Sequence, residues 1–213
     1  MTEILYFDKD ICVCIKPRGV LSEGEEQNCL PLLLRDALSQ KGIETEVFPV
    51  HRLDKETCGL MVYALNSKAA ADLSRQIQEG GFEKEYIAEL CGVPEKESDE
   101  LCDLLFFDRK RCRSYVVDRK RAGVKSARLS YTLLSTDGKY STLRVKLYTG
   151  RTHQIRVQFA SRGMPLRGDR RYGAPSDSGE FSLRSCYLAF NHPKTNKKLV
   201  FEGDKQIDEG DMK

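Results

Sequence analysis

The sequence predicts a single α+β domain over residues 1–213, with a mostly antiparallel, mixed β-sheet flanked by helices and loops. Three observations support this prediction. Many short apolar or alternating stretches are separated by turn residues, which is typical of strands. Only three stretches carry apolar residues at helical spacing. No linker in the 213 residues is long enough to separate two domains.

The expected strands alternate or are continuously apolar, and turn residues separate them. Ile11–Ile15 is apolar throughout and is therefore expected to be buried on both faces. The pair Asp137-Gly138 is a hairpin signal, and Pro193–Asn196 provides a second turn. The expected strands are two within 4–15 and one each at 60–65, 82–90, 115–117, 127–134, 141–147, 186–190 and 198–201.

The three expected helices are bounded by recognisable end signals. The first, over 30–41, has leucines on one face and is followed by Gly42, a typical residue at a helix C-terminus. Ser67 is a suitable N-cap for the second, which should end by Gly80. The third covers 155–162 and stops before Gly163. Residues 203–213 are expected to be frayed.

Composition excludes several classes of protein. Hydrophobic residues make up 40% and charged residues 31%, and no apolar run approaches the roughly 20 residues of a membrane span. The N-terminus shows no basic region followed by an apolar stretch, so we expect a cytoplasmic protein. Eight irregularly spaced cysteines without a C-x-x-C pair indicate reduced thiols, and three scattered histidines argue against zinc.

The net charge of +3 is small, but its distribution is uneven. Residues 109–128, called the basic segment below, contain nine lysines and arginines and one acid, Asp118. A second group of arginines lies within 162–171, whereas acids gather at 23–26 and 95–100. A basic face on a near-neutral protein suits a polyanion such as a nucleic acid. A solvated charged hairpin is the alternative.

The most informative stretch is His51-Arg52-Leu53-Asp54-Lys55-Glu56-Thr57-Cys58-Gly59-Leu60, where a polar cluster leads directly into a buried strand. Asp54 has basic neighbours on both sides, which favours an ionised carboxylate. A solvated turn with a capping aspartate would give the same composition. The stretch resembles the H-R-L-D-x-x-T-S-G-L signature of the RluA-type pseudouridine synthases, in which the aspartate is the catalytic nucleophile.

Four further stretches resemble motifs of the same family, in the same order. They are Lys16-Pro17-Arg18-Gly19, Lys84-Glu85-Tyr86-Ile87-Ala88, Thr149-Gly150-Arg151-Thr152-His153-Gln154-Ile155-Arg156-Val157 and Gly168-Asp169-Arg170-Arg171-Tyr172-Gly173. The chain departs from the family pattern at Cys58, which replaces serine, at Gln158, which replaces histidine, and at Arg167, which replaces an apolar residue. The resemblance covers most of the chain and implies the pseudouridine synthase fold.

The resemblance also implies an activity, namely the isomerisation of specific uridines in ribosomal or transfer RNA to pseudouridine. It assigns Asp54 as the nucleophile, Arg156 as its ion-pair partner and Tyr86 as the aromatic surface for a flipped base and an aid to proton removal from C5. We expect no organic cofactor and no metal ion, and a monomer. The residues expected to contact RNA are Arg52, Arg151, His153, Gln154 and Arg170.

Two other functions share these features. A catalytically silent RNA-binding module would keep the fold, and a nucleoside glycosidase would use Asp54 to cleave the same bond. The presence of Asp54, Tyr86 and Arg156 together favours the synthase over the silent module. No amino-terminal extension precedes the first motif, so we expect the catalytic domain itself to recognise RNA.

Overall fold

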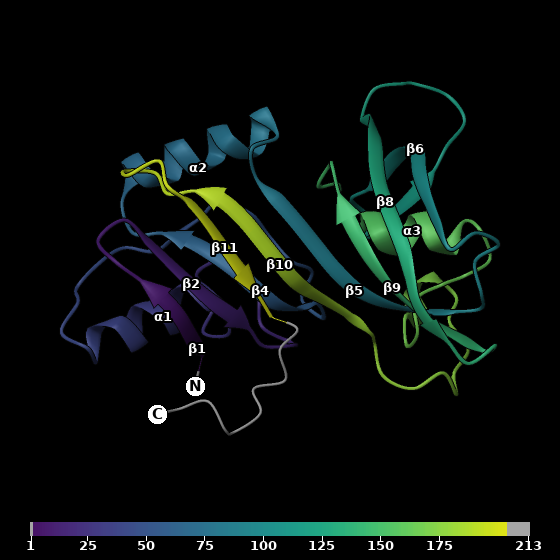
Figure 1. Cartoon of the computed structure of the whole chain (residues 1–213), viewed down its shortest axis with the longest axis horizontal. Helices are drawn as coiled ribbons and strands as arrows, with labels where there is room; N and C mark the ends of the chain where they lie inside the picture. Colours follow the sequence, from purple (N-terminus) through teal and green to yellow (C-terminus); the bar gives the residue numbers. More distant parts are fainter. Residues whose placement is uncertain (1, 204–213) are drawn as a thin grey trace. The chain divides into compact units, whose positions relative to one another are not determined.

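A computed structural model describes residues 2–203, so the expected frayed tail lies outside the described residues apart from Gly203. The α+β class and the mixed sheet are confirmed. The chain forms two compact units (Figure 1). Unit 1 contains Met1–Lys84 and Arg184–Lys213, and unit 2 contains Glu85–Leu183. No helix within residues 2–203 is long and apolar enough to cross a membrane.

Unit 1 is a sheet with two helices. Its strands run in the order β1-β2-β4-β10, with β3 beside β4 and β11 beside β10. The pair β4–β10 is parallel and the other pairs are antiparallel. The elements are β1 (Glu3–Phe7), β2 (Ile11–Lys16), α1 (Leu30–Ser39), β3 (Phe48–Pro49), β4 (Cys58–Ala64), α2 (Ser67–Glu79), β10 (Leu183–Asn191) and β11 (Lys198–Glu202).

The core of unit 1 forms where α2 packs on the sheet, as Figure 1 shows. Ala69 and Leu73 of α2 belong to one buried cluster with Val62 of β4 and Phe190 of β10. Each fully buried side chain of this size contributes about 1.5–3 kcal/mol through removal from water. Both β2 and β4 are buried along almost their whole length, as their continuous apolar sequences predict.

A histidine connects the β1–β2 turn to the β10–β11 turn. The Nδ1 atom of His192 accepts the backbone N–H groups of Lys194 and Thr195, so its Nε2 carries the proton and donates to Asp8 at 2.6 Å. Although burial raises the pKa of Asp8, hydrogen bonds from Asp10, Ile11 and other neighbours together hold it below its usual value. These hydrogen bonds stabilise the two turns.

Unit 2 is an antiparallel sheet in the order β5-β9-β8-β6-β7. One short helix, α3, lies against it (Figure 1), and Val157 of α3 packs with Leu105, Ala127 and Tyr172. The elements are β5 (Glu83–Cys91), β6 (Ser98–Asp108), β7 (Arg113–Val116), β8 (Val124–Thr136), β9 (Tyr140–Leu147), α3 (Gln154–Ala160) and the 3₁₀ helix η1 (Arg170–Tyr172).

Two expectations about these elements are corrected. Ser67 is the first residue of α2 and Asn66 is its N-cap, because the Asn66 side chain accepts the Ala69 N–H at 2.9 Å. The strand β6 was not expected, since its acidic residues obscure the alternation of the sequence. It pairs with β8 along nine positions, so the middle of the chain holds long strands rather than short ones.

Candidate active site

The segment around Asp54 is irregular backbone held by hydrogen bonds from other parts of unit 1. The buried hydroxyl of Ser22 donates to the Leu53 carbonyl at 2.8 Å and accepts the Leu53 N–H at 3.0 Å. On the other side of Asp54, the Lys55 carbonyl accepts the Gly19 N–H at 2.9 Å. Both peptide neighbours of Asp54 are therefore fixed, which limits the positions available to its carboxylate.

Lys16 provides a third attachment for this segment. Its side chain is buried, and Nζ donates to the carbonyls of Pro17, Val20 and Lys55 at 2.7–2.9 Å. Burial lowers the pKa of Lys16 to about 8, against the raising effect of nearby acidic groups that include Asp54. The lysine of the Lys-Pro-x-Gly motif thus acts as a hydrogen-bond donor to backbone, and it brings a positive charge close to Asp54.

His51 begins the motif and is hydrogen bonded to β4. Its Nε2 accepts the Val62 N–H at 3.1 Å, and its ring lies 5.4 Å from the Phe82 ring. Desolvation and the charge of Lys84 lower the pKa of His51 to about 3, so the ring is neutral at physiological pH. These contacts give His51 a structural role in unit 1.

Arg52 lies at the surface, where it pairs with Glu23 at 2.7 Å. Both side chains are more than half exposed. An exposed pair of this kind contributes only about 0.2–1 kcal/mol. The acidic loop 23–26 therefore contacts Arg52, which lies close to Asp54 in the sequence. A phosphate could replace Glu23 as the partner of Arg52 with little loss of free energy.

Tyr86 lies in β5 of unit 2, opposite Val145 of β9, and is buried. Two positions earlier, Lys84 is expected to share a face with Tyr86 because side chains alternate along a strand. Burial lowers the pKa of Lys84, and its Nζ lies 5.7 Å from the centre of the Phe82 ring. Since the lysine and the tyrosine come from alternate positions of one strand, the Lys-x-Tyr spacing has a simple structural basis.

Arg156 is the second buried member of the candidate site in unit 2. It projects from α3, and its Nε and Nη2 atoms donate to Asp169 at 2.6 and 2.8 Å. Its guanidinium lies 5.0 Å from the Tyr172 ring and 5.2 Å from the Phe181 ring. Only 7% of Arg156 is exposed, so it is not an ordinary surface arginine.

The turn before α3 has an unusual backbone conformation at His153, where φ is 55° and ψ is 26°. A non-glycine residue in this left-handed region is uncommon and costs about 1 kcal/mol or more. The Tyr172 hydroxyl accepts the Ser114 N–H and lies 2.9 Å from His153 Nδ1. The tautomer of His153 decides which of the two groups donates in this second hydrogen bond.

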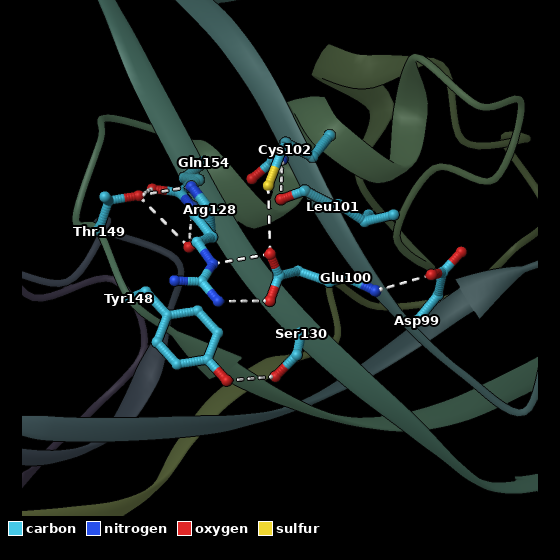
Figure 2. Close-up of polar contacts among 10 residues, drawn as sticks. Asp99, Glu100, Leu101, Cys102, Arg128, Ser130, Tyr148, Thr149 and Gln154 are labelled. Carbon is cyan, nitrogen blue, oxygen red and sulfur yellow. Dashed lines mark hydrogen bonds and ion pairs between the residues drawn. The ribbon is translucent and has the colours of Figure 1, made fainter.

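Gln154 organises the same turn from within the protein. It is 3% exposed, and its Oε1 accepts the Thr149 hydroxyl at 2.8 Å and the Arg151 N–H at 3.0 Å. Its Nε2 donates to the Arg128 carbonyl at 3.1 Å, as Figure 2 shows. Any contribution of Gln154 to RNA binding would therefore act through the position of the turn.

Arg128 connects this turn to β6 (Figure 2). Its Nε and Nη2 atoms donate to the two carboxylate oxygens of Glu100, both at 2.7 Å, and its guanidinium lies 4.5 Å from the centre of the Tyr148 ring. The Tyr148 hydroxyl lies 3.1 Å from that of Ser130. Arg128 is thus a member of the basic segment whose charge is already balanced by a bidentate acid.

The other predicted RNA contacts are exposed or partly exposed. Arg151 donates from Nε to the Ser126 carbonyl at 2.8 Å, and Arg170 is an exposed residue of η1. In the basic segment, Arg119 and Lys120 are exposed, and within residues 2–203 no carboxylate pairs with either. These side chains are accessible to a polyanion.

The predicted catalytic residues are distributed over both units. Asp54 belongs to unit 1, whereas Tyr86 and Arg156 belong to unit 2. The ion pair between Asp54 and Arg156 therefore stays a prediction. The sequence did not indicate the roles of Ser22, Lys16 and Asp169, although two of them lie in motifs. Had the sequence indicated that Arg156 is buried, this burial would have implied a carboxylate partner such as Asp169.

Comparison with known proteins gives a consistent result. The sequence profile of the family described as RNA pseudouridylate synthase matches residues 10–161. An uncharacterized RNA pseudouridine synthase of Aquifex aeolicus is 40% identical, over 93% of this chain and 68% of its own. The dual-specificity RNA pseudouridine synthase RluA of Haemophilus influenzae is 34% identical, over 93% and 91%.

Longer relatives and solved structures agree. Ribosomal large subunit pseudouridine synthase D of Nitrosomonas europaea is 32% identical over 94% of this chain, which spans only 61% of that protein. The structure of human RNA pseudouridylate synthase domain containing 4 superposes with a TM-score of 0.76 at 23% identity, over 94% of this chain and 87% of the other. At this identity the structural likeness shows the fold alone.

Proposed function

Because the chain belongs to the RNA pseudouridylate synthase family, we propose that it isomerises specific uridines in structured RNA to pseudouridine. The observation that carries the proposal is the family match, which spans the positions of Asp54, Tyr86 and Arg156. Relatives are named for ribosomal RNA, for transfer RNA or as dual-specificity enzymes, so we propose one of these two RNA classes as substrate.

In the proposed reaction, the Asp54 carboxylate adds to the sugar or to the base while the N1–C1′ bond breaks. The released base turns, and its C5 forms a new bond to C1′ as the aspartate leaves. The proton lost from C5 is balanced by one gained at N1, so the product has the mass of the substrate. No step requires an oxidant, a metal ion or an organic cofactor.

The partners of Asp54 have distinct parts in this proposal. Arg156 orients the carboxylate and favours its ionised form through charge-assisted hydrogen bonds. The target uridine leaves its stack, and Tyr86 supplies an aromatic face that offsets part of the few kcal/mol of unstacking. Tyr86 also assists removal of the proton from C5. Arg52 fills the space of the flipped base or binds a phosphate.

RNA recognition is assigned to the catalytic domain. Arg151 and Arg170 bind phosphates directly, and His153 contacts RNA from the strained turn before α3. Gln154 holds that turn in place by its buried hydrogen bonds. We place the reaction in the cytoplasm and assign it to a monomer.

The test is product analysis on RNA transcripts that carry tritium at C5 of uridine. A synthase releases tritium to water, and from unlabelled RNA it yields a nucleoside with the mass of uridine. A glycosidase yields free uracil and an abasic site, and a silent RNA-binding module gives neither product. Asp54→Asn serves as the inactive variant, and Asp36→Asn, at an exposed position of α1, controls for the loss of a carboxylate in unit 1.

A further inference from the structure

We propose that Asp169 is a positioning residue that fixes the guanidinium of Arg156 for the reaction; this inference rests on the proposed function. Asp169 lies in the Gly-Asp-x-x-Tyr-Gly motif, 13 residues after Arg156. The two side chains meet inside unit 2, where 8% of the arginine side chain and 1% of the aspartate side chain are exposed.

The contact between Arg156 and Asp169 is bidentate. Nε of Arg156 donates to one carboxylate oxygen of Asp169 at 2.6 Å, and Nη2 donates to the other at 2.8 Å. Two parallel hydrogen bonds fix the plane of a guanidinium as well as its distance, which a single bond would not do. A buried charge also requires a partner, since an uncompensated one would cost several kcal/mol.

Two aromatic rings restrict the guanidinium further. Tyr172 and Phe181 lie 5.0 and 5.2 Å from its central carbon, within the range of cation–π attraction. Tyr172 is itself fixed, because its hydroxyl accepts the Ser114 N–H at 2.8 Å. Rotation of the guanidinium about its long side chain is therefore opposed by a carboxylate and by two rings.

The backbone that carries Asp169 is held closely as well. The Asp169 N–H donates to the Leu166 carbonyl at 3.0 Å. At the preceding position, Gly168 has φ of +72°, and a Cβ there would collide with the backbone of Glu180 and Phe181. Asp169 is thus presented to Arg156 from a loop that is held by a backbone hydrogen bond and by close packing, as a positioning role requires.

Asp169 occupies only some of the hydrogen-bond donors of Arg156. Of the five N–H groups of a guanidinium, one on Nε and one on Nη2 bind Asp169. In the proposed reaction, other N–H groups of the same guanidinium orient the Asp54 carboxylate. Asp169 therefore determines which N–H groups of Arg156 serve the nucleophile in the proposed reaction, although Asp169 contacts no reacting atom.

The test compares Asp169→Asn with wild type in single-turnover isomerisation and in RNA binding. Asparagine keeps the shape but turns an N–H towards one guanidinium donor and removes the charge. We expect the rate to fall about 10–100-fold, since misplacement by about 1 Å costs as much. The dissociation constant for RNA should stay within about twofold of wild type. Asp169→Glu, which keeps the carboxylate, should recover part of the rate.

The matched control is Asp103→Asn. Asp103 is a largely buried carboxylate of unit 2 that pairs with Arg162 at 2.9 Å and accepts a hydrogen bond from Gln158 of α3 at 2.7 Å, so its variant perturbs α3 without removing the carboxylate that binds Arg156. This variant should keep the wild-type rate within about threefold. Wild-type turnover by Asp169→Asn would overturn the inference, as would an equal reduction in both variants.

A second measurement separates this inference from the proposed function. In wild type, the Arg156 Nε–H should exchange slowly with water because it is buried and bonded, and Asp169→Asn should accelerate its exchange, as followed by nitrogen-15 NMR. The Arg156→Lys spectrum assigns the signal. Unchanged slow exchange would overturn the positioning role even if the wild-type protein isomerised no uridine, whereas an inactive wild type would overturn only the proposed function.

Discussion

At the scale of single residues, Asp54 is positioned by the peptide groups on either side of it. Ser22 binds Leu53, and Lys16 binds the Lys55 carbonyl, so Asp54→Asn should leave the backbone in place. An amide cannot form the covalent intermediate, and we expect turnover to be abolished while the melting temperature and RNA affinity change little. Single-turnover assays with the purified variant check this. Activity within about tenfold of wild type, or about 1.4 kcal/mol in the barrier, would contradict the nucleophile assignment.

Arg156→Lys tests whether the geometry of the cation matters as much as its charge. Lysine keeps the charge but cannot donate two parallel hydrogen bonds to Asp169, so the ammonium is free to change direction. We expect the single-turnover rate to fall about 100-fold. Arg162→Lys, at a partly exposed ion pair of the same unit, is the control. If both lysine variants matched wild type, only the charge at position 156 would be needed.

Lys16 should link the stability of unit 1 to pH, and Lys16→Met should remove this link. In the folded protein the pKa of Lys16 is lowered to about 8 from an ordinary 10.5, so between these values the unfolded chain binds more protons. The free energy of unfolding of wild type therefore rises as pH increases from 8 to 10.5, and the Met variant lacks this rise. At pH 7 the variant should already be less stable by about 1–3 kcal/mol, because three carbonyls have no donor. Urea unfolding at several pH values measures the difference in unfolding free energy between wild type and Lys16→Met. A difference that does not change with pH would refute the linkage.

At the scale of secondary-structure elements, local patterns predicted most of the fold. The apolar run at β2, the helical spacing of α1 and the Asp137-Gly138 turn depend on neighbouring residues, and all three were predicted correctly. The strand β6 was missed because its stability comes from pairing with β8, about 25 residues away, rather than from its own sequence. The N-cap of α2 was placed one residue late because Asn66 and Ser67 both suit that position.

Gly59 shows how a motif glycine determines the packing of strands. It pairs with Ser185 across the parallel β4–β10 contact, has φ of +106°, and has no room for a Cβ against the Ser185 backbone. Gly59→Ala should therefore destabilise the protein by about 2–4 kcal/mol in chemical unfolding. Gly138→Ala is the matched control, since Gly138 also has positive φ but open space around it. Equal destabilisation would show that backbone strain, and not the close approach of β10, explains the effect.

At the scale of the whole molecule, sequence motifs identified the catalytic candidates but not the contacts that position them. Asp54, Tyr86 and Arg156 each lie in a recognisable sequence motif. Their supporting contacts join positions far apart in the chain, such as Ser22 with Leu53, and no single motif encodes such pairs. Gln154 illustrates the limit, because its motif suggested RNA contact whereas its side chain is buried in the protein.

The basic segment should determine the salt dependence of RNA binding. Removing one phosphate-binding charge reduces the slope of log K against log salt by roughly 0.7–0.9. Arg119→Gln with Lys120→Gln should therefore flatten the slope by up to about 1.4–1.8. Lys194→Gln with Lys197→Gln, also exposed, removes the same charge from the β10–β11 turn and serves as the control. Because net charge is only +3, the effect should be local to the basic segment. Equal slopes for the two variants would mean that the segment is a solvated face, and Arg170 would be the next position to test.

The order in which the chain is made has a consequence for unit 1. Its sheet is built from the first 84 residues and from those after Leu183, while unit 2 is continuous between them. During translation β2 and β4 leave the ribosome long before β10, which is the parallel neighbour of β4. The strands of unit 2 are therefore made before β10, while the apolar edge of β4 has no parallel strand beside it. A nascent chain halted before β10 should recruit chaperones through that edge, since unpaired strands aggregate readily.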